Sequence, residues 1–363
     1  MRLTRRVFLS ALAVPGWVRA AELPVFPPEW WRYSDAATEW EVYRLTNPEH
    51  VSHLPAWYNR TLSRRGTFLL YWSDRTGSVQ AFRMDLRTGE SLQLTEAGAL
   101  DGESLTLMPN DRSFCYFAGG VLRQRNIHNL REREIGRLSE GWERCPGSSV
   151  SRDGLYAVFG ESRNGQSRLR LLGIASRSQA TVGEFPFVLS HPQANPRRAQ
   201  VLYGQGAEAL WVVNFDGRQN RKLRTAPGTL GPAVWAPDGR TVLYLRFPEE
   251  KTRLYEIREH TPDENADKLI APTSQFVHFG VNSDASVFAG ASKNVNSPHV
   301  LILLRVTRRE LTVCEHHASD PRQVAPIFSP DNRFIFFESD KDGKMAIYRV
   351  RVERFVEPAE DET

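Results

Sequence analysis

Cysteine is scarce in this sequence, with only Cys115, Cys145 and Cys314 among 363 residues. These residues lie far apart and none forms a Cys-x-x-Cys pair, so neither a zinc site nor a disulfide framework is expected. Cys115 and Cys314 lie within apolar runs of strand character. The sequence therefore predicts buried free thiols.

Most of the chain also lacks an excess of charge of either sign. The full sequence has 47 Lys and Arg against 43 Asp and Glu, but the first 20 residues contain four arginines and no acid. Without that segment the two signs balance at 43 each. No overall field would then attract nucleic acid. No later apolar run approaches the length of a membrane span, so no stable membrane anchor is expected.

The first 20 residues have the features of an export signal. Arg5 and Arg6 precede an apolar run from Val7 to Val18, and Val18-Arg19-Ala20 resembles a cleavage site. Because Thr-Arg-Arg-x-Phe-Leu is close to the twin-arginine signature, we expect export to the periplasm or the exterior. A basic N-terminus on a cytosolic protein is the alternative.

A repeat of about 44 residues covers the remaining chain. Its clearest copy, "FSPDNRFIFFESDKDGKMAIYRVRV", combines a Ser-Pro-Asp turn, an alternating strand, a polar hairpin and a second strand. Successive copies are separated by 45, 43, 44, 41, 46 and 47 residues. The anchor residues of the seven copies are Arg64, Pro109, Arg152, Pro196, Pro237, Ser283 and Pro330. This period predicts an all-β, seven-bladed β-propeller, with an eight-bladed ring as the alternative.

The two ends of the repeat region complement each other. The last copy lacks a fourth strand, and "WEVYRLT" at residues 40–46 has the character of that strand. We expect this N-terminal strand to pair with the last blade and close the ring, because an open blade would expose its edge. The predicted organisation is an export signal (1–20), an N-terminal strap (21–39), the propeller (40–356) and an acidic disordered tail (357–363).

Equivalent positions of the repeat face one axis, so residues far apart in sequence can meet at the channel mouth. If each innermost strand follows its anchor turn, the position five residues before each anchor lies in the loop entering that strand. His191 and His278 occupy this position in two copies, although histidine is rare. We therefore expect them close together, either as part of a site or as ordinary structural histidines. His316 and His317 are expected to be solvated in a loop.

The sequence resembles the oligogalacturonate lyase family over nearly the whole chain after the signal. The resemblance is carried by "SHLPAWYN", "SHP" before the fourth copy, "LWVVNFDG" and "APIFSPDNRFIFFESDKDGKMAIY". It implies a seven-bladed propeller that cleaves short galacturonate oligosaccharides from pectin by β-elimination. The family uses a histidine base, an arginine and a manganese-type ion held by three histidines and a glutamine.

Carried onto this sequence, the resemblance matches only part of that set. Pro232 stands at the position of the base and Ala209 at that of the arginine. His278 matches one metal ligand, and Gln323 matches the glutamine after a small shift. His53 and His191 match other family histidines. The resemblance implies a divalent cation of manganese type, which His278 and Gln323 would hold.

Two functions remain open from the sequence. One is a divergent lyase, with His53, His191 and Arg322 as candidate catalytic residues and Trp57 and Tyr58 as candidate substrate-binding residues. Its partner would be an acidic oligosaccharide of galacturonate. The other is a non-catalytic TolB-like propeller outside the cytoplasm that binds a sugar or a protein partner, because the fold hosts many roles.

Overall fold

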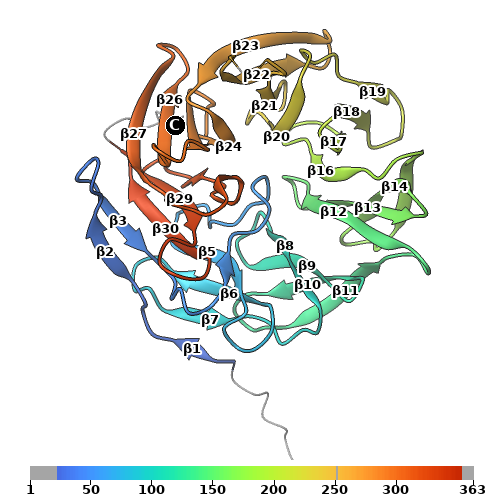
Figure 1. Cartoon of the computed structure of the whole chain (residues 1–363). Coiled ribbons are helices and arrows are strands. Elements are labelled where there is room, and N and C mark those ends of the chain that lie inside the picture. Colours follow the sequence, from blue (N-terminus) through green and yellow to red (C-terminus); the bar gives the residue numbers. More distant parts are fainter. Residues whose placement is uncertain (1–22, 251, 354–363) are drawn as a thin grey trace, which may run out of the picture.

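The protein forms a ring of antiparallel sheets around a central channel in a computed structural model that describes residues 23–250 and 252–353 (Figure 1). Seven sheets are present in this described part, each with four or five strands. This arrangement confirms the predicted seven-bladed β-propeller, and the alternative of an eight-bladed ring is wrong. The expected export signal and acidic tail lie outside the described residues.

In each blade the strands follow the chain from the channel outward, except that N-terminal strands are added outside blades one and seven. Blade one contains β4 (Ser52–His53), β5 (Phe68–Ser73), β6 (Gln80–Asp85) and β7 (Ser91–Gln93). Blade two contains β8 (Leu100–Leu107), β9 (Ser113–Ala118), β10 (Val121–Asn126) and β11 (Glu132–Arg137). Blade three contains β12 (Glu143–Val150), β13 (Tyr156–Arg163), β14 (Gln166–Gly173) and β15 (Gln179–Phe185).

The other blades repeat this order. Blade four contains β16 (Ser190–Ala194), β17 (Gln200–Gln205), β18 (Ala209–Asn214) and β19 (Arg221–Lys222). Blade five contains β20 (Thr229–Trp235), β21 (Val242–Phe247), β22 (Tyr255–Thr261) and β23 (Ala266–Thr273). Blade six contains β24 (Phe276–Val281), β25 (Val287–Ser292), β26 (His299–Leu304) and β27 (Arg309–Glu315). A short 3-10 helix, η1 (Pro321–Gln323), precedes β28 (Ile327–Phe328), β29 (Phe334–Ser339) and β30 (Ala346–Arg351) of blade seven.

The N-terminal segment completes the edges of two blades. β3 (Glu41–Arg44) pairs with β30, with Val42 opposite Val350, which confirms the predicted closing strand. β2 (Trp31–Ser34) adds a fifth strand outside β3, and β1 (Val25–Phe26) pairs with β7 of blade one. Residues 23–39 therefore follow the outer edges of the two adjoining blades.

The anchor turns link the innermost strand of a blade to its second strand. In blade seven, for example, Pro330 and Asp331 lie between β28 and β29. The expectation that each innermost strand begins after its anchor turn is therefore wrong, since that strand ends there. A left-handed backbone follows most anchors two residues on, which fits the final position of the turn. The residues with positive φ at this position are Gly66, Asp111, Gly154, Gly239, Ala285 and Asn332.

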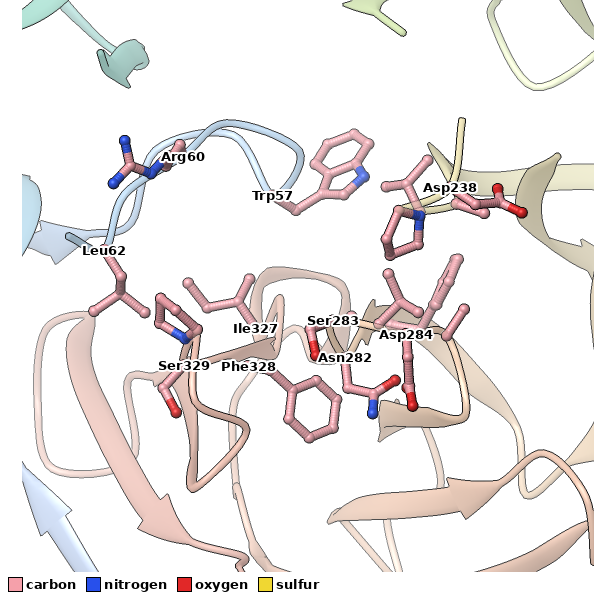
Figure 2. Close-up of a pocket in the computed structure, with 18 of the residues that line it drawn as sticks. Trp57, Arg60, Leu62, Asp238, Asn282, Ser283, Asp284, Ile327, Phe328 and Ser329 are labelled. Carbon is pink, nitrogen blue, oxygen red and sulfur yellow. The ribbon is translucent and has the colours of Figure 1, made fainter. Parts of the chain in front are cut away.

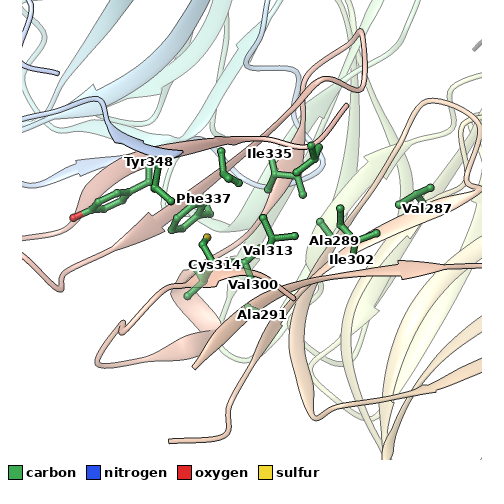
Figure 3. Close-up of a cluster of buried hydrophobic side chains, with 14 of the residues drawn as sticks. Val287, Ala289, Ala291, Val300, Ile302, Val313, Cys314, Ile335, Phe337 and Tyr348 are labelled. Atoms are coloured by element: carbon green, nitrogen blue, oxygen red, sulfur yellow. The ribbon is translucent and has the colours of Figure 1, made fainter. Parts of the chain in front are cut away.

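The core lies between blades, because the inner strands are buried on both faces. Figure 3 shows one such interface, where Val287 and Ala289 of β25 face Ile335 and Phe337 of β29. Cys314 also packs there, and all three cysteines are free and buried, as expected for Cys115 and Cys314. No helix within residues 23–250 and 252–353 is long and apolar enough to span a membrane.

Candidate functional site

A loop between β4 and β5 extends into the middle of the ring, where it is drawn in blue in Figure 1. Backbone bonds fix it to blade two, from Ala56 N–H to the Glu103 carbonyl and from Leu107 N–H to the Arg60 carbonyl. Trp57 reaches from this loop to the far side of the channel. Its indole N–H lies 3.4 Å from the Ala233 carbonyl oxygen of blade five.

Trp57 brings the two predicted histidines together. Its ring centroid lies 4.8 Å from that of His191 and 5.2 Å from that of His278, and Trp57 meets the His278 ring edge-on. The two histidines come from innermost strands of blades four and six, so the predicted proximity is confirmed. They lie within β16 and β24 and not in loops before them, because the anchor turn follows the strand.

Irregular pairing directs these side chains into the channel. The register of β16 shifts between Ser190 and Gln193, and that of β24 shifts between Phe276 and His278. His191 adopts a φ of +49°, a left-handed conformation that is uncommon outside glycine. β8, β12 and β20 contain register shifts as well. Such bulges commonly re-aim side chains beside functional sites.

Burial keeps both imidazoles neutral. Burial, with the neighbouring His191 acting in the same direction, lowers the pKa of His278 to about 3. It also lowers the pKa of His191 to about 4, with the charge of Arg144 acting in the same direction. Nδ1 of each ring is buried without a hydrogen-bond partner among the described residues. Both rings therefore offer an unused polar atom at neutral pH.

Tyr58 adds a third polar group to this cluster. A Cβ at Gly147 would touch the Tyr58 hydroxyl and would lie 2.8 Å from His191 Cα and 3.2 Å from His191 Nδ1. Only glycine leaves room for both side chains at this point of β12, where φ is +85°. Burial raises the pKa of Tyr58, so its phenol is neutral and cannot serve as a base near pH 7.

Trp57 and His191 line a cavity of about 390 Å³ between blades four and five. Pro232 and Leu210 also line it, and Leu210 follows Ala209 in β18. Pro232 and Ala209 stand at the positions where the family resemblance implies a base and an arginine. The cavity thus has apolar residues at or beside both positions.

Sequence reasoning missed Arg144, a largely buried cation whose charge acts on this cluster. Arg144 of β12 forms an ion pair with Asp101 of β8, and its other guanidinium nitrogen, Nη1, is buried without a partner among the described residues. The charge of Arg144 influences the pKa of both Tyr58 and His191. Both Asp101 and Arg144 precede their anchors by eight residues, a repeat position whose chemistry could have revealed them.

His53 forms a separate pair at the same loop. Its Nδ1 lies 2.7 Å from Glu338 Oε2, and its ring stacks on Trp72 at 4.5 Å. Burial alone lowers the pKa of His53, but the hydrogen bond and charge of Glu338 outweigh it and raise the pKa. Glu338 was not identified from the sequence, because its partner lies 285 residues away.

The remaining candidates lie near blade seven. Arg322 is exposed in η1 and forms a local two-point pair with Asp320, at 3.0 Å between Nη2 and Oδ2. Gln323 is also exposed, although η1 packs beside β24. The expectation of solvated loop histidines is wrong for His316, which is buried and bonds the Ser292 carbonyl at 2.9 Å. Its neighbour His317 is exposed.

The donor set does not fit a manganese ion. Within the described residues, no three His, Cys, Asp or Glu side chains gather closely enough to hold a metal. The indole of Trp57 packs against both His191 and His278, and the side chain of Gln323 faces solvent. Manganese favours carboxylate and other oxygen ligands, which this cluster lacks.

Fold and site together define a seven-bladed β-propeller with a polar cluster inside its channel. A family model described as oligogalacturonate lyase matches residues 24–181. An oligogalacturonide lyase from Pectobacterium atrosepticum is 25% identical over 88% of this chain and 95% of its own length. An oligogalacturonate lyase from Dickeya dadantii is 24% identical, with the same two coverages.

Solved structures agree in fold. An oligogalacturonate lyase in complex with manganese aligns with a TM-score of 0.86 at 22% identity, covering 92% of this chain and 98% of its own. A second one, from Vibrio parahaemolyticus, aligns with a TM-score of 0.84 at 22% identity, covering 92% and 99%. The chain is thus similar to oligogalacturonate lyases in sequence and in fold.

Proposed function

We propose that this protein binds short galacturonate oligosaccharides in its channel, in the cavity that Trp57 and His191 line. Two buried polar atoms without partners among the described residues, Nδ1 of His191 and Nη1 of Arg144, are the observation that carries the proposal. Buried polar groups are normally satisfied, and exceptions often mark a place where a ligand supplies the partner.

The groups around the cavity suit an acidic sugar. Arg144 does not line the cavity, but its charge acts on His191, which does. Its guanidinium would attract a uronate carboxylate, and arginine matches the planar geometry of that group. The indole of Trp57 provides an apolar surface beside the cavity. Ligand sites commonly combine such a surface with a few convergent polar groups.

The proposed role is binding, with elimination greatly slowed. β-Elimination needs a base beside the sugar proton and stabilisation of the charge that develops on the carboxylate. Pro232 cannot accept a proton, and His191, with a pKa of about 4, is a weak base. A manganese ion, which the family resemblance implies, would supply charge stabilisation when bound, but the donors present do not fit it.

Calorimetric titration of the exported protein with digalacturonate tests binding, with maltose as the neutral control. We expect saturable binding of digalacturonate alone, and no measurable binding would contradict the proposal. Absorbance of unsaturated uronate, measured with and without added manganese, tests turnover in the same samples. A strong rise would show that the chain is an active lyase.

The predicted export to the periplasm or exterior is part of this proposal. Its support is the twin-arginine sequence at residues 1–20, together with a substrate class that derives from an extracellular polymer. Fractionation of cells that express the full chain, with Arg5 and Arg6 changed to lysine as the comparison, tests it. Retention of the wild-type chain in the cytoplasm would contradict it.

A further inference from the structure

A second hollow lies at the opposite end of the channel and shares Trp57 with the channel cavity. A cavity of about 880 Å³ and one of about 690 Å³ share Asn59, Arg60, Arg152 and Pro237. Both are lined by anchor turns, which lie at the end of the innermost strands away from His191. Figure 2 shows Trp57 at the edge of the larger cavity, with Arg60 and Leu62 on one side and Asp238 on the other.

Arginines gather on one side of this hollow. The lining includes Arg60 and Arg64 from blade one, Arg152 from blade three and Arg197 from blade four. Arg60 is held in place by the Met108 carbonyl at 2.8 Å and by an ion pair with Asp111. The guanidinium groups of Arg64, Arg152 and Arg197 have no ion-pair partner in the described part of the chain.

Acidic residues lie on the other side of the hollow and are already engaged. Glu259 forms an ion pair with Arg305 at 2.9 Å. Asp238 accepts the Arg240 N–H at 2.9 Å, and Asp284 accepts the Ser286 N–H at 2.9 Å. The smaller cavity has no acidic residue in its lining. A negatively charged ligand would therefore be held at the side formed by blades one, three and four.

The other lining groups suit a sugar chain better than a small inorganic ion. Pro109, Pro196 and Pro237 line the smaller cavity together with Tyr58 and Asn59. Apolar surfaces with a few charged groups are typical of sites for extended organic ligands. Arginines on three blades also match carboxylates that recur along a chain.

We propose that the turn-side hollow is a second binding site, which takes a segment of a polyuronate chain through Arg64, Arg152 and Arg197. The choice of ligand class rests on the proposed function, whereas the existence of an anion site here does not. Trp57 lines both this hollow and the channel cavity, but Arg152 and Arg197 line only the hollow, so their replacement tests it without changing a residue of the channel cavity.

Affinity electrophoresis in gels that contain polygalacturonate tests the site, with fully methyl-esterified polygalacturonate as the uncharged control. The variant is Arg152→Gln/Arg197→Gln, and the matched control is Arg87→Gln/Arg131→Gln, which removes two exposed arginines from outer turns. We expect the wild-type protein to be retarded only in the charged gel. The dissociation constant of the Arg152→Gln/Arg197→Gln variant should be about tenfold higher. Thermal unfolding of each variant verifies that it is folded.

Three results would overturn the second site. They are equal retardation of both variants, equal retardation in both gels, or displacement of polygalacturonate by millimolar inorganic phosphate, which would indicate a simple anion site. Calorimetry of digalacturonate with the Arg152→Gln/Arg197→Gln variant separates the two proposals. Unchanged binding supports two sites, and parallel loss of both would mean a single site. If digalacturonate fails to bind the wild-type protein while retardation persists, the channel proposal fails and this one stands.

Discussion

Asp101 and Arg144 form an ion pair across the channel-facing strands of blades two and three. The pair occupies half of the guanidinium, and Nη1 of Arg144 is left buried without a partner among the described residues. A carboxylate that approaches Nη1 would complete the hydrogen bonding of the group. Arg144 is thus already positioned for an acidic ligand.

Arg144→Gln should weaken digalacturonate binding about tenfold, because it removes the cation of the channel site. Asp101→Asn is the matched control, since it releases Arg144 and should leave the affinity equal or tighter. Calorimetry measures both. The Arg144→Gln change should also raise the pKa of His191, which the charge of Arg144 lowers. NMR titration of the His191 ring measures this shift, and an unchanged pKa would show that Arg144 does not act on the cluster.

Trp57→Ala should loosen the channel. The indole lines both the 390 Å³ and the 880 Å³ cavities and covers His191 and His278. Its removal should lower the free energy of unfolding by about 2 kcal/mol, since the ring is half-buried and not fully enclosed. It should also raise the pKa of His278 by admitting water. Urea unfolding and NMR titration are the measurements. Trp57→Phe, which keeps an aromatic ring, should show less than half of either effect.

Stability should fall as the pH drops below about 6.5, because the native state keeps His191 and His278 neutral. Their folded pKa values, about 4 and about 3, lie below the ordinary value of 6.5. Between these values the unfolded chain binds protons that the native chain does not. Each imidazole then lowers the free energy of unfolding by about 1.4 kcal/mol for each unit that the pH falls. Urea midpoints measured from pH 7 to 4 test this slope.

His278→Asn should reduce the pH dependence of the unfolding free energy by the contribution of one imidazole, about 1.4 kcal/mol per pH unit. His128→Asn, at an exposed turn, should leave that dependence unchanged. His53 acts in the opposite direction, since its raised pKa stabilises the fold below about 6.5 and the effect disappears at higher pH. Equal slopes in wild type and His278→Asn would contradict the buried neutral imidazole.

The repeat could be predicted from the sequence because local signals fix each blade. The turn at Ser329-Pro330-Asp331 and the alternating strand after it need no distant contact to form. The closing strand was predictable for a different reason, since an unpaired edge at β30 requires a partner. Proximity of His191 and His278 followed from repeat spacing alone.

The contents of the channel could not be predicted in the same way. Bulges in β16 and β24 shift which side chain faces the axis, and their positions depend on packing against neighbouring blades. Trp57 reaches blades four and six from a loop that the repeat does not describe. His316 is drawn into the core by the Ser292 carbonyl, a contact between adjoining elements that its loop sequence does not reveal.

Val42→Asp should destabilise the ring more than any change at an exposed edge. Val42 is fully buried in β3, opposite Val350 of β30, and packs into the interface of blades six and seven. An unpaired carboxylate there should lower the free energy of unfolding by at least about 3 kcal/mol. Glu41→Gln is the matched control, because its pair with Arg32 is exposed and contributes less than about 1 kcal/mol. Thermal unfolding of both variants tests the closure, and equal melting temperatures would show that β3 does not hold the ring together.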